Sequence, residues 1–224
     1  MVLKIGISGK MGSGKSTLAA HLEETYGFVR VSFAWPIKEL ESIQAGVYDD
    51  RTAEAKLQQI INGLVAANKA GPTSEAKKHK MMDWLGSLFT KYPQMPGKKN
   101  RPFLQSLGHG ARERFGDTIW VDYALQEAKE HQKVVIDDVR YENEIHILKG
   151  AGFSLWRVIV DSNIQTERLE NLYGQEALGY VGHQSELGLD DKLHLFDHII
   201  CNNDSLDDLH RSIRAILMPS SSPS

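Results

Sequence analysis

The amino-acid sequence predicts a three-layer α/β fold with a mostly parallel sheet and a helical insertion. Short apolar runs such as residues 2–8 and 133–140 alternate with segments that carry apolar residues at helical spacing. Parallel strands need crossover connections of this kind. From about residue 49 to residue 100 the patterns are helical, apart from a Pro/Gly-bounded loop, so the insertion is expected there.

The first half of the chain supplies two strands and several helices. After the strand at 2–8, residues 15–26 form the expected crossover helix, which Gly27 ends at the usual C-terminal position. Residues 28–34 alternate and are β-rich, and Pro36 then begins a helix that extends to about residue 45. Further helices are expected at 53–67, through 81–89, at 103–115 and at 118–131, with breaks at 108–110 and 116–117.

The second half returns to the strand–helix alternation. After the apolar strand at 133–140 come a helix from near Tyr141, a strand at 153–160, a helix at 163–173, a strand at 197–202 and a helix at 206–217. Residues 174–182 are glycine-rich, as a lid would be, and we place the lid at about 168–186. Residues 1–218 are predicted to form one domain, and the polar residues 219–224 a disordered tail.

Composition excludes several classes of protein. The chain of 224 residues is 41% hydrophobic and 25% charged, which argues against a disordered or membrane protein. No apolar run is long enough to span a bilayer and the N-terminus leads directly into a strand, so a cytoplasmic protein is expected. A net charge of −3 gives no general reason to bind nucleic acid. The single cysteine, Cys201, lies in an apolar run and is predicted to be a buried, inert thiol.

The most informative stretch is residues 9–16, Gly-Lys-Met-Gly-Ser-Gly-Lys-Ser, which we call the phosphate loop. A loop that wraps a polyphosphate must turn its backbone N–H groups inward, and glycine permits the conformations and the close approach. Lys15 is placed to reach the β- and γ-phosphates, and the Ser16 hydroxyl to ligate Mg²⁺. An ordinary glycine-rich turn is the alternative; the strand before the loop and the helix after it favour the phosphate loop.

A second stretch ends the strand at 133–140 with Asp137, Asp138 and Arg140. A carboxylate beside the phosphate loop can hold the water shell of Mg²⁺, whereas an acidic loop that caps the next helix is the simpler alternative. Lys38 lies just past the second strand, at the sheet edge where ligands bind, and is either an anion-binding residue or a solvated lysine.

Several stretches together resemble, in order, the motifs of the bacteriophage deoxynucleoside monophosphate kinases. They are residues 9–17, residues 33–38, Leu104-Gln105-Ser106-Leu107-Gly108 with Trp120-Val121, Asp138-Val139-Arg140 with Glu144, and His183-Gln184-Ser185-Glu186. The resemblance implies a P-loop kinase fold, often dimeric, that transfers the γ-phosphoryl group of ATP to a deoxynucleoside 5′-monophosphate (dNMP). A phage-encoded enzyme would act in the host cytoplasm.

The resemblance also assigns residues to roles. ATP would be bound by Gly12, Ser13, Gly14, Lys15, Ser16 and Thr17, with Mg²⁺ at Ser16 and Asp138. The dNMP would be bound by Lys38, Arg101, Gly108, His109, Trp120, Asp138, Arg140, Glu144 and Ser185. Lys15, Asp138 and Arg140 would carry the catalysis, and Arg157 and Arg168 are the candidates for a lid arginine.

Two other functions stay open. One is another small-molecule P-loop kinase, similar to phosphomevalonate kinase, with which the chain shares a D-x-R and S-E arrangement. The other is a nucleotide-dependent switch or DNA-associated ATPase, in which the helical insertion binds a partner. The absence of a guanine-reading N-K-x-D motif and the negative net charge weigh against the second.

Overall fold

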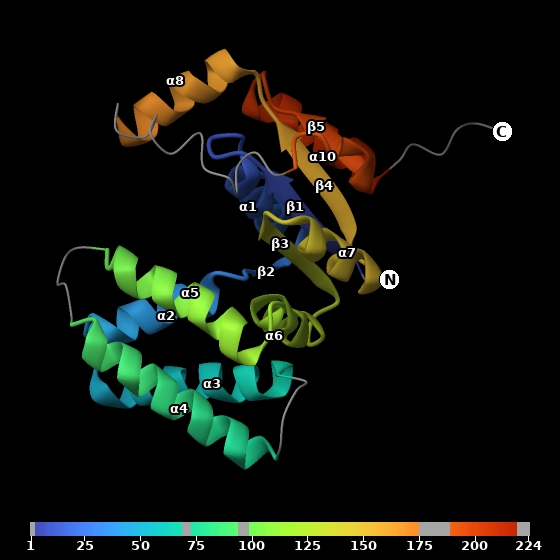
Figure 1. The fold of residues 1–224 in the computed structure, drawn as a ribbon. Coiled ribbons are helices and arrows are strands. Elements are labelled where there is room, and N and C mark those ends of the chain that lie inside the picture. Colours follow the sequence, from blue (N-terminus) through green and yellow to red (C-terminus); the bar gives the residue numbers. More distant parts are fainter. Residues whose placement is uncertain (1–2, 69–72, 94–98, 175–188, 219–224) are drawn as a thin grey trace. The chain divides into compact units, whose positions relative to one another are not determined.

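The computed structural model describes residues 3–68, 73–93, 99–174 and 189–218 (Figure 1). Its elements are β1 (Leu3–Gly9), α1 (Lys15–Tyr26), β2 (Val29–Val31), α2 (Trp35–Gln44), α3 (Asp50–Ala67), α4 (Ser74–Lys91), α5 (Arg101–Phe115), α6 (Ile119–Ala128), β3 (Lys133–Val139), α7 (Glu142–Gly150), β4 (Ser154–Ile159), α8 (Ser162–Tyr173), η2 (Leu193–Leu195), β5 (His198–Cys201) and α10 (Leu206–Leu217).

The chain divides into two compact units. The sheet unit combines residues 1–31 with 131–224, and the helical unit comprises residues 32–130. The helical unit is wider than the predicted insertion at about 49–100, because it also contains α2, α5 and α6. Most of the expected lid and the whole expected tail lie outside the described residues.

The sheet unit contains five parallel strands in the order β2-β3-β1-β4-β5. β1 lies at the centre, where it pairs with β3 on one side and with β4 on the other. β3 follows β1 only after more than a hundred residues, so the sheet edge at the end of β1 collects residues from distant parts of the sequence. This topology confirms the predicted α/β class with a parallel sheet.

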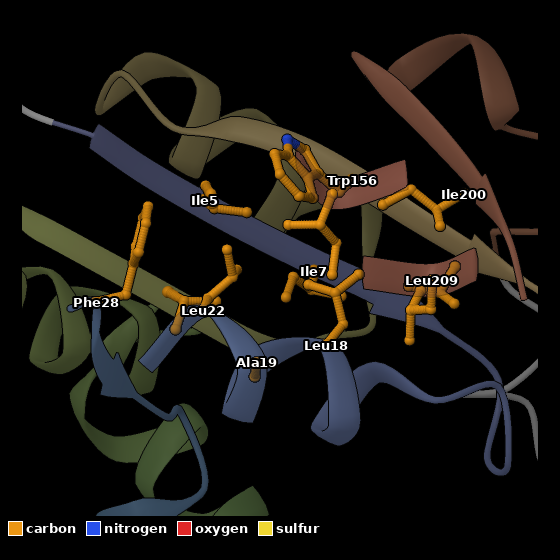
Figure 2. Packing of buried hydrophobic residues seen from close by; sticks show 12 residues of the cluster. Ile5, Ile7, Leu18, Ala19, Leu22, Phe28, Trp156, Ile200 and Leu209 are labelled. Carbon is orange, nitrogen blue, oxygen red and sulfur yellow. The ribbon is translucent and has the colours of Figure 1, made fainter. Parts of the chain in front are cut away.

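One face of the sheet packs against α1 and α10. Ile5 and Ile7 of β1 and Trp156 of β4 point toward Leu18 and Leu22 of α1 in a buried cluster (Figure 2), which Leu209 and Ile213 of α10 extend. Burial of each such large apolar side chain stabilises the fold by about 1.5 to 3 kcal/mol. This cluster is the core of the sheet unit.

The opposite face of the sheet packs against α7. A Cβ on Gly6 would lie 2.9 Å from a methyl carbon of Leu155 and 3.1 Å from one of Leu148, so the glycine lets α7 approach closely. The sheet therefore lies between a layer made of α1 and α10 and a layer that contains α7. These are the three layers that the sequence predicts.

The helical unit is built from α2 to α6. Helix α3 packs against α6 and α4, and α2 packs against α5. The predicted break at residues 108–110 is wrong, since α5 is continuous from Arg101 to Phe115. The buried stripe of Phe103, Leu107 and Ala111 stabilises the helix, and Gly110 fits where a Cβ would lie 3.1 Å from the Trp84 ring.

Cys201 is exposed, so its predicted burial is wrong. β5 lies at the edge of the sheet, and the alternation of side chains along it directs Ile200 into the core and Cys201 away from it. In the part of the chain that the structure describes, no helix has the length and apolar character needed to cross a membrane.

Candidate active site at the phosphate loop

The phosphate loop connects the end of β1 to the start of α1. Gly12 and Gly14 have φ angles of 77° and 97°, in the left-handed region that favours glycine. The Ser13 N–H donates to the Lys10 carbonyl over 3.1 Å, which closes the turn. Gly14 is the N-cap residue of α1 and has no side chain that could cap the helix. The first N–H groups of α1 and the positive end of its dipole are therefore suited to an anion.

Lys15 is the first residue of α1. Its ammonium group donates to the carbonyl oxygens of Gly9 and Lys10, the second over 2.7 Å, so the cation lies against the phosphate loop. That this ammonium group reaches the β- and γ-phosphates stays a prediction of the sequence.

Ser16 faces the end of β3. Its hydroxyl lies 3.4 Å from Oδ2 of Asp137, whose side chain is almost fully buried. Arg30 of β2 holds both carboxylate oxygens of Asp137, with Nε 3.1 Å from Oδ1 and Nη2 bonded to Oδ2. Burial alone would lower the pKa of Arg30, but the hydrogen bond and charge of Asp137 outweigh it and raise that pKa above its ordinary value.

The geometry favours Asp137 over Asp138 for a cation beside Ser16. The resemblance points to Asp138 instead, but neighbouring residues of a strand direct their side chains to opposite faces. A hydroxyl and a carboxylate are hard oxygen ligands of the kind that Mg²⁺ prefers. Ser16 and Asp137 therefore fit a magnesium ion.

Glu144 acts locally on the turn after β3. Its Oε2 accepts from the backbone N–H groups of Arg140, over 2.7 Å, and Tyr141, over 3.1 Å. The carboxylate is buried and stabilises the positive end of α7. Glu144 thus fixes the backbone of Arg140. Arg140 itself is exposed. Helix capping is the alternative role expected for Asp137 and Asp138. In the structure Glu144 caps α7 instead.

Arg157 lies beneath the phosphate loop. Its guanidinium donates to the Ser8 hydroxyl over 2.9 Å and pairs with Asp190 over 2.8 Å. Asp190 also pairs with Lys10 of the loop, over 2.5 Å. Because the Arg157 side chain is only 5% exposed, this arrangement supports the loop and does not suit a lid arginine. Arg168 is the candidate that keeps partial exposure.

Two side-chain amides that the sequence patterns do not predict bind the phosphate loop. Gln165 of α8 donates to the Met11 carbonyl over 2.7 Å, and Asn202, just after β5, donates to the Ser13 carbonyl over 2.8 Å. Asn202 could have been found, since polar residues at the carboxyl ends of parallel strands commonly line ligand sites. Gln165 lies in the middle of a helix and gives no such signal.

The helical unit holds the other predicted substrate residues. Lys38, Arg101 and His109 are exposed. Nε2 of His109 lies 3.4 Å from Oε1 of Glu113. Trp120 is 1% exposed, and its indole N–H donates to the Gly108 carbonyl over 3.0 Å. This burial suits a role in supporting Gly108 and leaves no ring face for stacking. Ser185 lies outside the described residues.

The fold and the loop geometry define the class as an α/β protein with a five-stranded parallel sheet and a glycine-rich loop at the start of a helix. No protein-family model matches the chain. Over 162 residues the chain is 28% identical to a protein of Acanthamoeba polyphaga mimivirus named "Putative deoxynucleotide monophosphate kinase". That alignment covers 70% of this chain and 74% of the relative.

Two solved structures are similar along nearly their whole length. The Thermus thermophilus protein TT1252 has a TM-score of 0.48 and 18% identity, with 99% of each chain covered. A dephospho-CoA kinase from Campylobacter jejuni has a TM-score of 0.39 and 15% identity, with 95% of this chain and 96% of that chain covered.

Proposed function

We propose that the protein is a kinase that transfers the γ-phosphoryl group of ATP to a dNMP, giving the deoxynucleoside diphosphate and ADP. The observation that carries the phosphotransfer is the phosphate loop, with Lys15 against it and Ser16 facing a buried carboxylate. The choice of a dNMP as acceptor rests on the ordered motifs of the sequence and on the name of the viral relative.

Charge neutralisation is the main chemical task of such a site. The N–H groups of the loop and of the start of α1, together with Lys15, would bind the β- and γ-phosphates of ATP. Ser16 and Asp137 would hold Mg²⁺, which would supply positive charge to offset that of the phosphates. Arg140 would bind phosphate oxygens, with its backbone fixed by Glu144.

No general base is required in this reaction. The acceptor is a phosphate whose second pKa is about 6, so it is largely dianionic at neutral pH and already nucleophilic. Catalysis then consists of holding two anions in line while cations offset their repulsion. For the acceptor we assign the residues named by the resemblance, with Lys38 and Arg101 as its cationic ligands and Trp120 supporting Gly108.

The test is ADP release from Mg·ATP with each acceptor offered separately. The acceptors are the four dNMPs, the matching ribonucleotides and phosphomevalonate. Turnover with at least one dNMP is expected, and the comparison of bases and sugars gives the specificity. Turnover with phosphomevalonate alone would show that the acceptor is phosphomevalonate and not a dNMP. ATP binding without turnover on any acceptor would favour a switch or DNA-associated ATPase.

A further inference from the structure

Two carbonyl groups of the phosphate loop are each held by a buried side-chain amide. Gln165 reaches the Met11 carbonyl from α8, and Asn202 reaches the Ser13 carbonyl from the end of β5. Both amide side chains belong to residues that are only 7% exposed. Because α8 and β5 come from distant parts of the sequence, these contacts are a property of the tertiary structure.

Packing around the two glycines keeps these amides in place. A Cβ on Gly14 would lie 2.2 Å from the Asn202 side-chain nitrogen, and a Cβ on Gly12 would lie 3.2 Å from Leu169 and 3.6 Å from Gln165. The glycines therefore admit the close approach of α8 and Asn202 to the loop backbone. This is a second reason for glycine at these positions, in addition to their φ angles.

Because of the geometry of the peptide bond, these two contacts also fix the direction of two backbone N–H donors. In a planar trans peptide, the carbonyl of one residue and the N–H of the next point in opposite directions, and the described residues contain no cis peptide. Fixing the Met11 carbonyl therefore fixes the direction of the Gly12 N–H. Fixing the Ser13 carbonyl does the same for the Gly14 N–H.

We propose that Gln165 and Asn202 are positioning residues that hold the Gly12 and Gly14 N–H groups in the orientation required to bind a polyphosphate. The proposal rests on the proposed function only in that the phosphate loop binds such an anion. Neither residue needs to contact the ligand. Donors fixed before binding cost no reorganisation when the anion arrives, which is how preorganised sites gain affinity.

The test measures the affinity of Mg²⁺-bound inorganic tripolyphosphate by calorimetry, well below the unfolding temperature of each variant. Gln165→Met and Asn202→Leu keep approximate size and remove the donor without adding charge. Each should weaken binding about tenfold, since each removes the hydrogen bond through which an amide orients a loop carbonyl. Tripolyphosphate has no base or sugar, so the measurement isolates the loop.

A matched pair separates the donor from charge. Asn202→Asp replaces the donor by an acceptor opposite the Ser13 carbonyl, whereas Asn203→Asp adds the same charge one residue away and keeps an acceptor for the Asp161 N–H, which Asn203 now binds over 2.8 Å. Asn202→Asp should weaken binding more strongly than Asn203→Asp. Equal losses would show that charge alone matters and would overturn the assignment of Asn202.

The remaining outcomes are also decisive. If the wild-type protein fails to bind tripolyphosphate or ATP, the proposed function fails. If it binds them and the folded Gln165→Met and Asn202→Leu proteins bind equally well, the positioning role fails while the proposed function stands. Should an Asn202 variant not fold, Gln165→Met alone decides, with the exposed Asn163→Met on the same helix as its control.

Discussion

Gly14→Ala tests whether the phosphate loop has room for a side chain. Gly14 has a φ angle of 97°, and a Cβ there would lie 2.2 Å from the Asn202 side-chain nitrogen. Gly27, the C-cap of α1, is the matched control, because its φ angle is 69° but a Cβ there would meet nothing within 4 Å. Both substitutions impose a left-handed alanine, and only the first also forces Asn202 away.

The expected magnitudes follow from these two contributions. A left-handed alanine costs about 1 to 2 kcal/mol, which is the whole expected effect of Gly27→Ala. Moving Asn202 breaks its bond to the Ser13 carbonyl and leaves buried polar groups unpaired, which costs about 1 to 3 kcal/mol more. Gly14→Ala should therefore lower the free energy of unfolding by about 2 to 5 kcal/mol.

Thermal and urea unfolding of the two variants measure this difference. For a chain of this size 1 kcal/mol corresponds to about 2 to 4 °C in Tm, so Gly14→Ala should melt clearly below Gly27→Ala. Tripolyphosphate binding should fall for Gly14→Ala and stay unchanged for Gly27→Ala. Equal stability of the two variants would refute the steric argument, because Asn202 would then move aside without cost.

Three further predictions concern charge. Lys15→Ala should abolish ADP release and leave the unfolding temperature near that of the wild type; near-normal turnover would exclude the proposed mechanism. Asp137→Asn should weaken Mn²⁺ binding, followed by electron paramagnetic resonance in place of Mg²⁺, more than Asp138→Asn does, and the reverse order would support the assignment from resemblance. Burial, and then the positive charge of His210, whose ring stacks on His21, lower the pKa of His21 below 6.5. The unfolded chain therefore binds more protons between that lowered pKa and 6.5, so the free energy of unfolding should fall as the pH falls through this window. Urea titrations across the window should show a smaller loss in His210→Gln, and an unchanged slope would contradict this cause.

Local patterns were enough to predict most of the elements. The helix at 206–217 has the predicted bounds, and the strands and helices around the phosphate loop lie within a few residues of theirs. Errors arose where packing outweighed local preference. The glycines at 108 and 110 suggested a break, yet the buried stripe of α5 carries the helix through them. Cys201 lies in an apolar run, yet an edge strand has one face open.

The sequence by itself determined the phosphate loop, because glycine conformations, a cation and a hydroxyl at fixed spacing are local properties of a contiguous segment. The tertiary structure decided which distant groups reach it. Pairing of β1 with β3 brings Asp137 to Ser16, and the placement of α8 and β5 brings Gln165 and Asn202 to the loop carbonyls. These contacts join residues more than a hundred positions apart, where sheet register and side-chain direction select the partner and no local pattern records the choice.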